Sequence, residues 1–430
     1  MYVAVDDTDS STWMCTTFLA TELIRTLDDL DLIGFPRLVR LNPAVPWKTR
    51  GNGALCIRVG KGCGDRQYIG SIAGRKIFCY SDLESEPDID DVFSRCIDLV
   101  KEWSQTDHAD PGLVVCRDDV DASLYDKAVH RIISKEEALS YLEGKDHRVF
   151  QINKGRGVIG ASASISWKPG DYTYEVLAYR ERSKWGTPRH VNAEDVRQLD
   201  ELFPSTFNNY DEGLSKPAIV PNTSCPILYG VRGDSFEDLL KAREFIRSEE
   251  VERWLIYLSN QGTDDHIIED YYSLEPNSSY AVEGTVASIP VTVAGGHVIL
   301  TIDAGEKLEC AAYEPSKGFR NVIRALRPGD LVKVFGELRE EPRTLNIEKL
   351  QVVSLSSFKI KVANPKCSVC GRIMKSVGAG QGYRCRDCGT KSNDVLMAEE
   401  PRTISIGWYE PPVCSRRHLS KPLKRCNFED

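Results

Sequence analysis

The sequence lacks the features of a membrane-bound or exported protein. None of its apolar runs approaches the roughly 18 residues that a helix needs to span a bilayer. Met1 leads directly into a strand-like segment, without the basic stretch and cleavage site of a signal peptide. We therefore expect a cytoplasmic protein with no membrane partner, and no protein partner is evident from the sequence.

An excess of positive charge is also absent. The chain has 55 Lys and Arg residues against 64 Asp and Glu residues, which gives a formal net charge of −9. This excludes a uniformly basic nucleic-acid binder, although it leaves room for local basic patches. The length of 430 residues predicts about three or four domains.

A disulfide framework is not expected, although the chain has 14 cysteines. The chain is long, and most of its cysteines stand singly, unlike those of small secreted domains. Five cysteines lie in apolar stretches, and we expect them to be buried and reduced. These are Cys56, Cys79, Cys96, Cys116 and Cys310.

Four other cysteines form two Cys-x2-Cys pairs. They are Cys367, Cys370, Cys385 and Cys388. Two such pairs place four thiolates around one Zn²⁺, and a glycine after each pair permits the turn that this requires. The spacing predicts a zinc ribbon with a structural Zn²⁺, because a redox dithiol would not need the second pair.

An acidic turn stands near the start of the chain. The strand-like run Val3 to Val5 leads into a segment that contains Asp6, Asp7, Thr8 and Asp9. A helix is expected to begin around Thr16, and carboxylates between a strand end and a helix N-terminus suit Mg²⁺ and phosphate. Taken alone, the segment could equally be a helix-capping turn without a ligand.

Two further segments have a composition suited to ligands. Residues 42–53 contain Lys48, Arg50 and Asn52 beside two glycines, which favours contacts with phosphate groups. Residues 153–164 are rich in Gly, Ala and Ser. These small residues allow either a ligand or a neighbouring element to approach the backbone closely.

The pattern of strands and helices predicts a multidomain α+β protein. Residues 1–150 alternate strands and helices, as in an α/β domain. Residues 151–275 contain a strand, helix, strand series of ferredoxin-like type. Residues 276–358 have the short strands and turns of an OB-fold, a barrel that usually binds single-stranded nucleic acid. Residues 359–430 hold the ribbon and a basic tail.

The tail is basic in an otherwise acidic chain. Its cations include Arg416, Arg417, Lys421 and Arg425. Beside an OB-fold and a zinc ribbon we expect them to contact RNA phosphates, and the alternative is a solvated end without a role.

Taken in order, these segments resemble the archaeal tRNA-isoleucine 2-agmatinylcytidine synthetases, and the resemblance covers nearly the whole chain. Between Val59 and Phe93 the likeness is lost, and we expect a helix there that differs in length. The residues that carry the resemblance are Asp6 to Ser11, Met14 to Thr17, Ile33 to Pro43, Lys48 to Ala54, Gly157 to Ala161, Tyr174 to Arg180 and Asn260 to Asp264.

The resemblance implies an ATP-dependent ligase that modifies tRNA. Such an enzyme joins agmatine to the wobble cytidine of the isoleucine tRNA with a CAU anticodon, through phosphorylation of the cytosine 2-oxo group. A kinase-like ATP-binding domain is implied for residues 1–150. The implied catalytic residues are Asp6, Asp7 and Asp9, which would hold Mg²⁺ on ATP, and Thr16, which would be phosphorylated.

The resemblance also implies binding residues. Thr8, Lys48, Arg50 and Asn52 would contact the phosphates of ATP. Glu175 and Asp211 are candidates for the guanidinium of agmatine.

Two other function classes stay open at this point. A non-catalytic OB-fold and zinc-ribbon adaptor for nucleic acid would show no ATP turnover. A small-molecule kinase with an RNA-binding tail would turn over ATP independently of tRNA.

Overall fold

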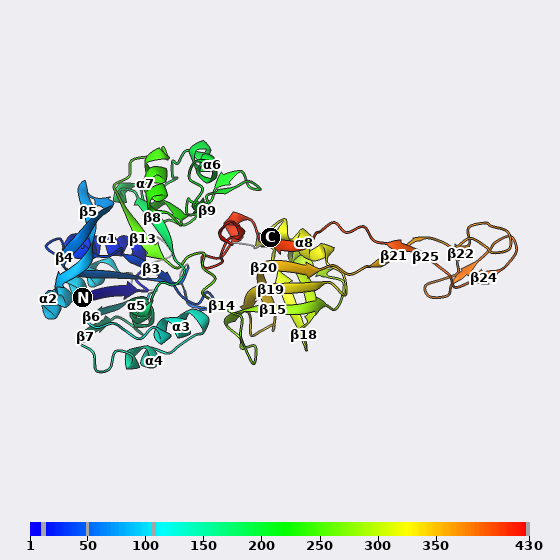
Figure 1. Cartoon of the computed structure of the whole chain (residues 1–430), viewed down its shortest axis with the longest axis horizontal. Helices are drawn as coiled ribbons and strands as arrows, with labels where there is room; N and C mark the ends of the chain where they lie inside the picture. Colours follow the sequence, from blue (N-terminus) through cyan, green and yellow to red (C-terminus); the bar gives the residue numbers. More distant parts are fainter. Residues whose placement is uncertain (10–13, 49–50, 105–108, 427–430) are drawn as a thin grey trace.

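The computed structural model describes residues 1–9, 14–48, 51–104 and 109–426. Arg50, predicted to contact phosphate, lies outside the described residues, as do Ser10 and Ser11 of the acidic segment. Figure 1 shows a broad N-terminal body, a barrel beside it and a small unit at the end of a narrow stalk. No helix in the described ranges is both long enough and apolar enough to cross a membrane.

The N-terminal body is built on one mixed sheet. Its main path runs β7-β6-β1-β4-β3-β13-β8-β12-β9, and β2 and β5 are attached to β4. The strands are β1 (Tyr2–Asp6), β2 (Asp31–Ile33), β3 (Arg37–Arg40), β4 (Gly53–Ile72), β5 (Arg75–Ser85), β6 (Gly112–Cys116), β7 (His147–Gln151), β8 (Thr173–Tyr179), β9 (Thr206–Phe207), β12 (Ile227–Gly233) and β13 (Arg253–Ser259).

Helices cover both faces of this sheet. Val3 and Val5 of β1 belong to one apolar core and Tyr2 and Ala4 to another, as the two-residue period of a strand requires. The first core receives α1, α2, α6 and α7, and the second receives α3, α4 and α5. Their bounds are α1 (Thr16–Thr26), α2 (Ile89–Trp103), α3 (Ser123–His130), α4 (Lys135–Ser140), α5 (Gly157–Ser166), α6 (Ala193–Leu202) and α7 (Phe236–Phe245).

The sheet continues from the first predicted domain into the second. Strand β13 pairs in parallel with β3, with Leu258 opposite Arg37, and antiparallel with β4. The boundary predicted near residue 150 therefore does not separate two sheets. The kinase-like and ferredoxin-like assignments stay predictions.

The segment after Val59 contains a hairpin that the sequence did not predict, and the helix expected in this stretch follows it. Strand β4 runs on to Ile72 and pairs with β5, and α2 begins only at Ile89. Ala73 and Gly74, both with positive φ, form the turn, and two such residues suit the twist of a two-residue hairpin.

A closed barrel follows the N-terminal body. Strand β15 pairs with β19 and β17, and the circuit closes through β18 and β20. Five strands are the number found in an OB-fold, which is the assignment predicted for this region. Helix α8 (Phe319–Ala325) packs on this core. The strands of the barrel sheet are β14 (Ile267–Ile268), β15 (Ser278–Val286), β16 (Val291–Thr292), β17 (Val298–Asp303), β18 (Lys307–Ala312), β19 (Leu331–Leu338), β20 (Leu345–Ser354) and β26 (Gly407–Tyr409).

The terminal unit is inserted into the barrel. Strands β21 (Lys359–Ala363) and β25 (Leu396–Glu399) pair as an antiparallel stalk, with Lys359 opposite Glu399. The unit beyond them has three short strands, β22 (Lys375–Ser376), β23 (Tyr383–Arg384) and β24 (Lys391–Ser392). After the stalk the chain returns to the barrel as β26, which pairs with β20.

The basic tail is not a solvated end. Residues 410–426, which we call the clasp, run from the barrel back to the N-terminal body (Figure 1). The clasp is therefore separate from the ribbon, although we grouped the two in one predicted unit. The five cysteines expected to be buried are all buried.

Candidate functional site

The acidic turn lies against the N-terminus of α5. Asp6 is the last residue of β1, and Asp7 takes a left-handed backbone conformation with a φ of 52°. A Cβ added to Gly160 would lie 1.9 Å from the Asp6 Oδ2, and one added to Gly157 would lie 2.3 Å from the Asp6 carbonyl oxygen. The small residues of this segment thus let α5 pack directly on the end of β1, which explains the composition that we noted in the sequence.

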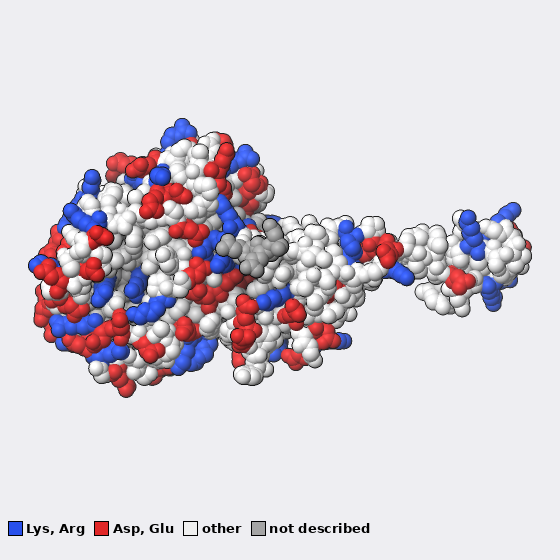
Figure 2. Space-filling view, viewed as in Figure 1, with Lys and Arg blue, Asp and Glu red and all other residues white. Residues whose placement is uncertain are grey.

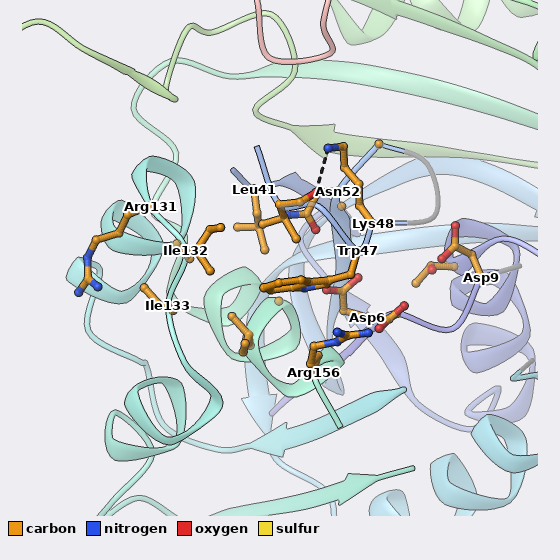
Figure 3. A pocket seen from close by; sticks show the side chains of 18 residues that line it. Asp6, Asp9, Leu41, Trp47, Lys48, Asn52, Arg131, Ile132, Ile133 and Arg156 are labelled. Atoms are coloured by element: carbon orange, nitrogen blue, oxygen red, sulfur yellow. Dashed lines mark hydrogen bonds between the residues drawn. The ribbon is translucent and has the colours of Figure 1, made fainter. Parts of the chain in front are cut away.

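A first cavity opens at this turn. Carboxylates line one side of it, and apolar side chains line the other (Figure 3). The polar lining residues are Asp6, Asp7, Asp9, Thr16, Lys48, Asn52, Arg131 and Arg156. The larger apolar ones are Leu41, Val45, Trp47, Ile132, Ile133 and Ile159.

The carboxylic acids of this cavity ionise less readily than acids in water. Burial raises the pKa of Asp6 well above its ordinary value, and the neighbouring charge of Asp7 raises it further. Burial likewise raises the pKa of Asp7 to about 6. Both shifts express the cost of ionising crowded, desolvated acids, so a bound divalent cation would be stabilised here.

Two residues that sequence reasoning missed complete the turn. The backbone N–H of Asp110 donates to Asp7 Oδ2 at 3.1 Å, and the Asp110 carboxylate pairs with Arg156 at 2.5 Å. The Arg156 guanidinium also lies 5.0 Å from the centre of the Trp47 ring. Arg156 belonged to the small-residue segment, but no local signal connected it with the acids of residues 6–9.

Thr16 occupies the first position of α1 and is buried. Thr8 is fully buried, and its hydroxyl donates to the Thr16 hydroxyl at 3.2 Å. Cys15, at the cap position, makes no side-chain cap hydrogen bond to the helix. The Cys15 thiol instead lies 3.3 Å from the Thr17 hydroxyl, and the start of α1, like other helix N-termini, favours a phosphate group.

The predicted phosphate-binding residues of the next loop line the cavity but turn partly away from it. The Lys48 amino group donates to the carbonyls of Pro43 and Val45 at 2.6 and 2.9 Å, and in Figure 3 it points away from the acids. The Asn52 amide donates to the Asn42 carbonyl at 3.1 Å. Their contact with ATP stays a prediction.

A second, larger cavity of about 520 Å³ adjoins the first. The two share Asp9, Thr16, Gly51 and Gly53. Its other walls come from the N-terminal sheet, residues 207–232 and the clasp. Thr16, the first residue of α1, thus lies where the two cavities meet.

The two candidates for agmatine differ in their surroundings. Glu175 lines the second cavity, where it accepts hydrogen bonds from Arg232 Nε at 3.0 Å and from the Gln261 amide. Asp211 accepts the backbone N–H groups of Leu214 and Cys414, each at 3.0 Å. These hydrogen bonds outweigh the effect of burial and lower the pKa of Asp211, so this carboxylate anchors the clasp. Agmatine contacts by either residue stay a prediction.

The four cations predicted to bind tRNA have carboxylate partners within the chain. Arg416 pairs with Glu410, and Arg417 pairs with Glu337 and Glu348. Lys421 and Arg425 both pair with Asp171, and Arg425 also pairs with Asp234. The clasp is therefore held by ion pairs to the N-terminal body and the barrel, and its contact with tRNA stays a prediction.

The four ribbon cysteines converge. Cys367 Sγ lies 3.3 Å from Cys388 Sγ, and Cys370 Sγ lies 3.4 Å from Cys385 Sγ and 3.8 Å from Cys388 Sγ. A tetrahedral site with Zn–S bonds of about 2.3 Å has sulfur separations of about 3.8 Å, so the cluster fits Zn²⁺. The predicted zinc ligands are thereby brought together as the spacing required.

A second cluster of metal-binding residue types serves a different purpose. Asp264, His266 and Glu348 lie close together between the body and the barrel. However, Lys349 pairs with Asp264. Glu348 contacts His266 and also pairs with Arg417. This cluster is an ion-pair network that joins two parts of the chain.

Comparison with known proteins gives matches along almost the whole length. Family models described as the TiaS TCKD domain, the TiaS FLD domain and the TiaS C-terminal zinc ribbon domain match residues 2–154, 155–266 and 364–404. The isoleucine-tRNA 2-agmatinylcytidine synthetase TiaS of Archaeoglobus fulgidus is 39% identical, over 100% of this chain and 98% of the relative. That of Methanocaldococcus jannaschii is 36% identical, over 99% and 98%.

Solved structures agree with these matches. The complex of TiaS with its isoleucine tRNA and ATP superposes with a TM-score of 0.86 at 38% identity. The complex of TiaS with the same tRNA, AMPCPP and agmatine superposes with a TM-score of 0.83 at 36% identity. Each comparison covers 100% of this chain and 98% of the other. The resemblance noted in the sequence is confirmed, and this chain belongs to the isoleucine-tRNA 2-agmatinylcytidine synthetase family.

Proposed function

We propose that the protein uses ATP to join agmatine to the wobble cytidine of the isoleucine tRNA with a CAU anticodon, giving 2-agmatinylcytidine. The observation that carries this proposal is the junction of two cavities at Asp9, Thr16 and Gly51. A reaction that first phosphorylates the cytosine 2-oxo group and then displaces the phosphate with an amine needs two ligand sites that meet at one point.

The first cavity is suited to ATP. Its apolar side, with Trp47 and Ile133, would receive the base, and its acidic side would receive the triphosphate. Asp6, Asp7 and Asp9 offer the oxygen ligands that Mg²⁺ prefers, and the metal would neutralise phosphate charge during transfer. The positive end of the α1 dipole and the side chain of Arg156 would stabilise the phosphates further.

The second cavity is suited to the amine and the base. The carboxylates of Glu175 and Asp9 reach this space and complement the two positive charges of agmatine. Its volume of about 520 Å³ lies within the usual range of small-ligand sites. The wobble base must leave the anticodon stack to enter it.

The distal modules would hold the tRNA. The OB-fold assignment of the barrel implies binding to single-stranded RNA. Figure 2 shows acidic and basic side chains mixed over the N-terminal body, whereas basic side chains predominate at the ribbon. Attraction of the RNA phosphates would therefore come in large part from the ribbon, and contacts of the clasp with RNA would compete with the ion pairs of its four cations.

Mass spectrometry tests the proposal directly. The tRNA is incubated with the protein, ATP and agmatine, digested, and its nucleosides are weighed. We expect one modified cytidine, which disappears when ATP or agmatine is left out. No modification and no ATP turnover would favour the adaptor, and ATP turnover independent of tRNA would favour the small-molecule kinase.

A further inference from the structure

The clasp brings one side chain, His418, to the junction of the two cavities. Its backbone is fixed there, because Gly262 N donates to the His418 carbonyl at 2.8 Å and Asp264 N donates to the Leu419 carbonyl at 2.9 Å. Leu419 is only 2% exposed and belongs to the apolar core around α3 and α5. The position of His418 is therefore set by hydrogen bonds to the loop 260–264 and by the packing of Leu419.

The imidazole of His418 has a defined orientation. Arg232 Nη2 lies 3.0 Å from His418 Nδ1. A guanidinium only donates hydrogen bonds, so Nδ1 is the acceptor and the proton of the neutral ring is on Nε2. The ring also lies against Gly51, since a Cβ added to Gly51 would be 2.7 Å from His418 Cδ2.

His418 ends a hydrogen-bonded chain of polar side chains beside the second cavity. Arg232 Nε donates to Glu175, and the Gln261 amide donates to the other oxygen of Glu175. Arg40 Nε donates to Gln261 Oε1 at 3.2 Å, and Arg40 Nη1 donates to the Gly51 carbonyl at 3.0 Å. This polar chain comprises the side chains of Arg40, Glu175, Arg232, Gln261 and His418.

The surroundings keep His418 neutral. The charge of Arg40, desolvation by the surrounding atoms and the charge of Arg232 together lower the pKa of His418 well below its ordinary value, although its side chain is exposed where it lines the second cavity. Of the negative groups nearby, Glu175 accepts hydrogen bonds from Arg232 and Gln261, and the charge of Asp9 acts on Arg40. A proton on Nδ1 would break the hydrogen bond from Arg232 and add a third cation to the junction.

We propose that neutral His418 is a positioning residue for the modification reaction. It holds Arg232 on Glu175 and packs against Gly51, which lines both cavities. The catalytic site is therefore complete only when the clasp is docked. This inference rests on the proposed function of the cavities, but the orientation of the His418 imidazole can be tested without it.

Rescue by a conservative variant separates positioning from mere packing. His418→Ala removes the acceptor, whereas His418→Asn keeps an amide oxygen where Nδ1 stands. We expect the alanine variant to lose about tenfold to hundredfold in kcat for tRNA modification, the worth of a hydrogen bond to a charged group. The KM for ATP should change little, and the asparagine variant should recover most of the rate. His190→Gln, at an exposed histidine far from the junction in the sequence, is the matched control.

The contact with Gly51 provides an independent variant. Gly51→Ala should displace the imidazole and lower the rate, and combining it with His418→Ala should cost less than the two single losses added together. Thermal unfolding of each variant shows whether it is folded. Equal activity of His418→Ala and wild type, an asparagine variant as poor as alanine, or additive losses would each overturn the proposal.

Nuclear magnetic resonance of labelled histidines tests the ring without relying on catalysis. Assigned by comparison with His418→Asn, the His418 signals should be those of the neutral Nε2-protonated form and should not titrate between about pH 5.5 and about pH 8. Titration near the ordinary histidine pKa would overturn the inference. If the wild-type enzyme modified no tRNA while the His418 signals were those of the neutral Nε2-protonated form, the proposed function would fail and the geometry of the His418 imidazole would stand.

Discussion

Substitution of Gly160 by alanine should disable ATP use while changing stability little. The added Cβ would lie 1.9 Å from Asp6 Oδ2 and 2.7 Å from Asp6 Cγ, much closer than the roughly 3.5 Å of an ordinary contact. The Asp6 carboxylate must therefore move by about 1 Å or more, and such a displacement of a catalytic group can cost about 100-fold in rate.

The effect on stability is smaller because two contributions oppose each other. Alanine is better than glycine inside a helix by about 1 kcal/mol, whereas overpacking costs about 1–3 kcal/mol. The net loss should be about 0–2 kcal/mol. The variant should thus remain folded while its use of ATP fails.

The assay compares tRNA modification, Mg²⁺-dependent ATP binding and thermal unfolding of the two proteins. Gly318→Ala is the matched control, since Gly318 has helical φ and ψ and no neighbour within 4 Å of an added Cβ. Full activity of Gly160→Ala with unchanged affinity for Mg²⁺ and ATP would refute the reasoning, because Asp6 could then not be needed in its observed position.

The same geometry leads to three more expectations. Thr16→Ala should abolish or severely lower tRNA modification and leave tRNA affinity near normal, because the hydroxyl lies at the junction of the cavities. Kinetics and a binding titration check this, and a fully active variant would contradict it. The pKa of Asp7 is raised to about 6 in the folded protein, so the folded state holds the Asp7 proton more tightly than the unfolded state does. The stability that this proton contributes is complete below the unfolded pKa of about 4 and is lost as the pH rises through 6. Mg²⁺ should therefore raise the melting temperature more at about pH 7.5 than at about pH 5.5, and a pH-independent effect in thermal scans would count against the metal site. Joining Phe358 to Glu400, whose backbones are hydrogen-bonded at 2.7 Å, should remove the ribbon and its zinc but leave the rest of the protein folded. Cutting the chain before Ser415 should instead leave Asp171 without its ion pairs and lower both the melting temperature and the affinity for tRNA. Metal analysis and unfolding curves distinguish these two deletions, and equal stability of both would show that the clasp is not anchored.

Local features of the site could be predicted because they depend on near neighbours in the chain. The four ribbon cysteines are two short pairs, and a pair of this spacing presents both thiolates from one turn. The acids of residues 6–9 follow a strand and precede a helix, so their place at a sheet edge is implied by the order of elements. The hairpin after Val59 was missed, because the two-residue turn at Ala73 and Gly74 was not recognised.

The tertiary structure decided which distant residues meet. Arg156 reaches the acidic turn only because Gly157 and Gly160 let α5 pack on β1. A local charge pattern predicted a basic tail exposed for RNA, but the fold supplies a carboxylate for each of its four predicted cations and places His418 against Gly51. The sequence by itself determined the family, the zinc ligands and the acidic turn. The assembly of the two cavities depends on strand register and on packing between segments far apart in the chain, which no local pattern encodes.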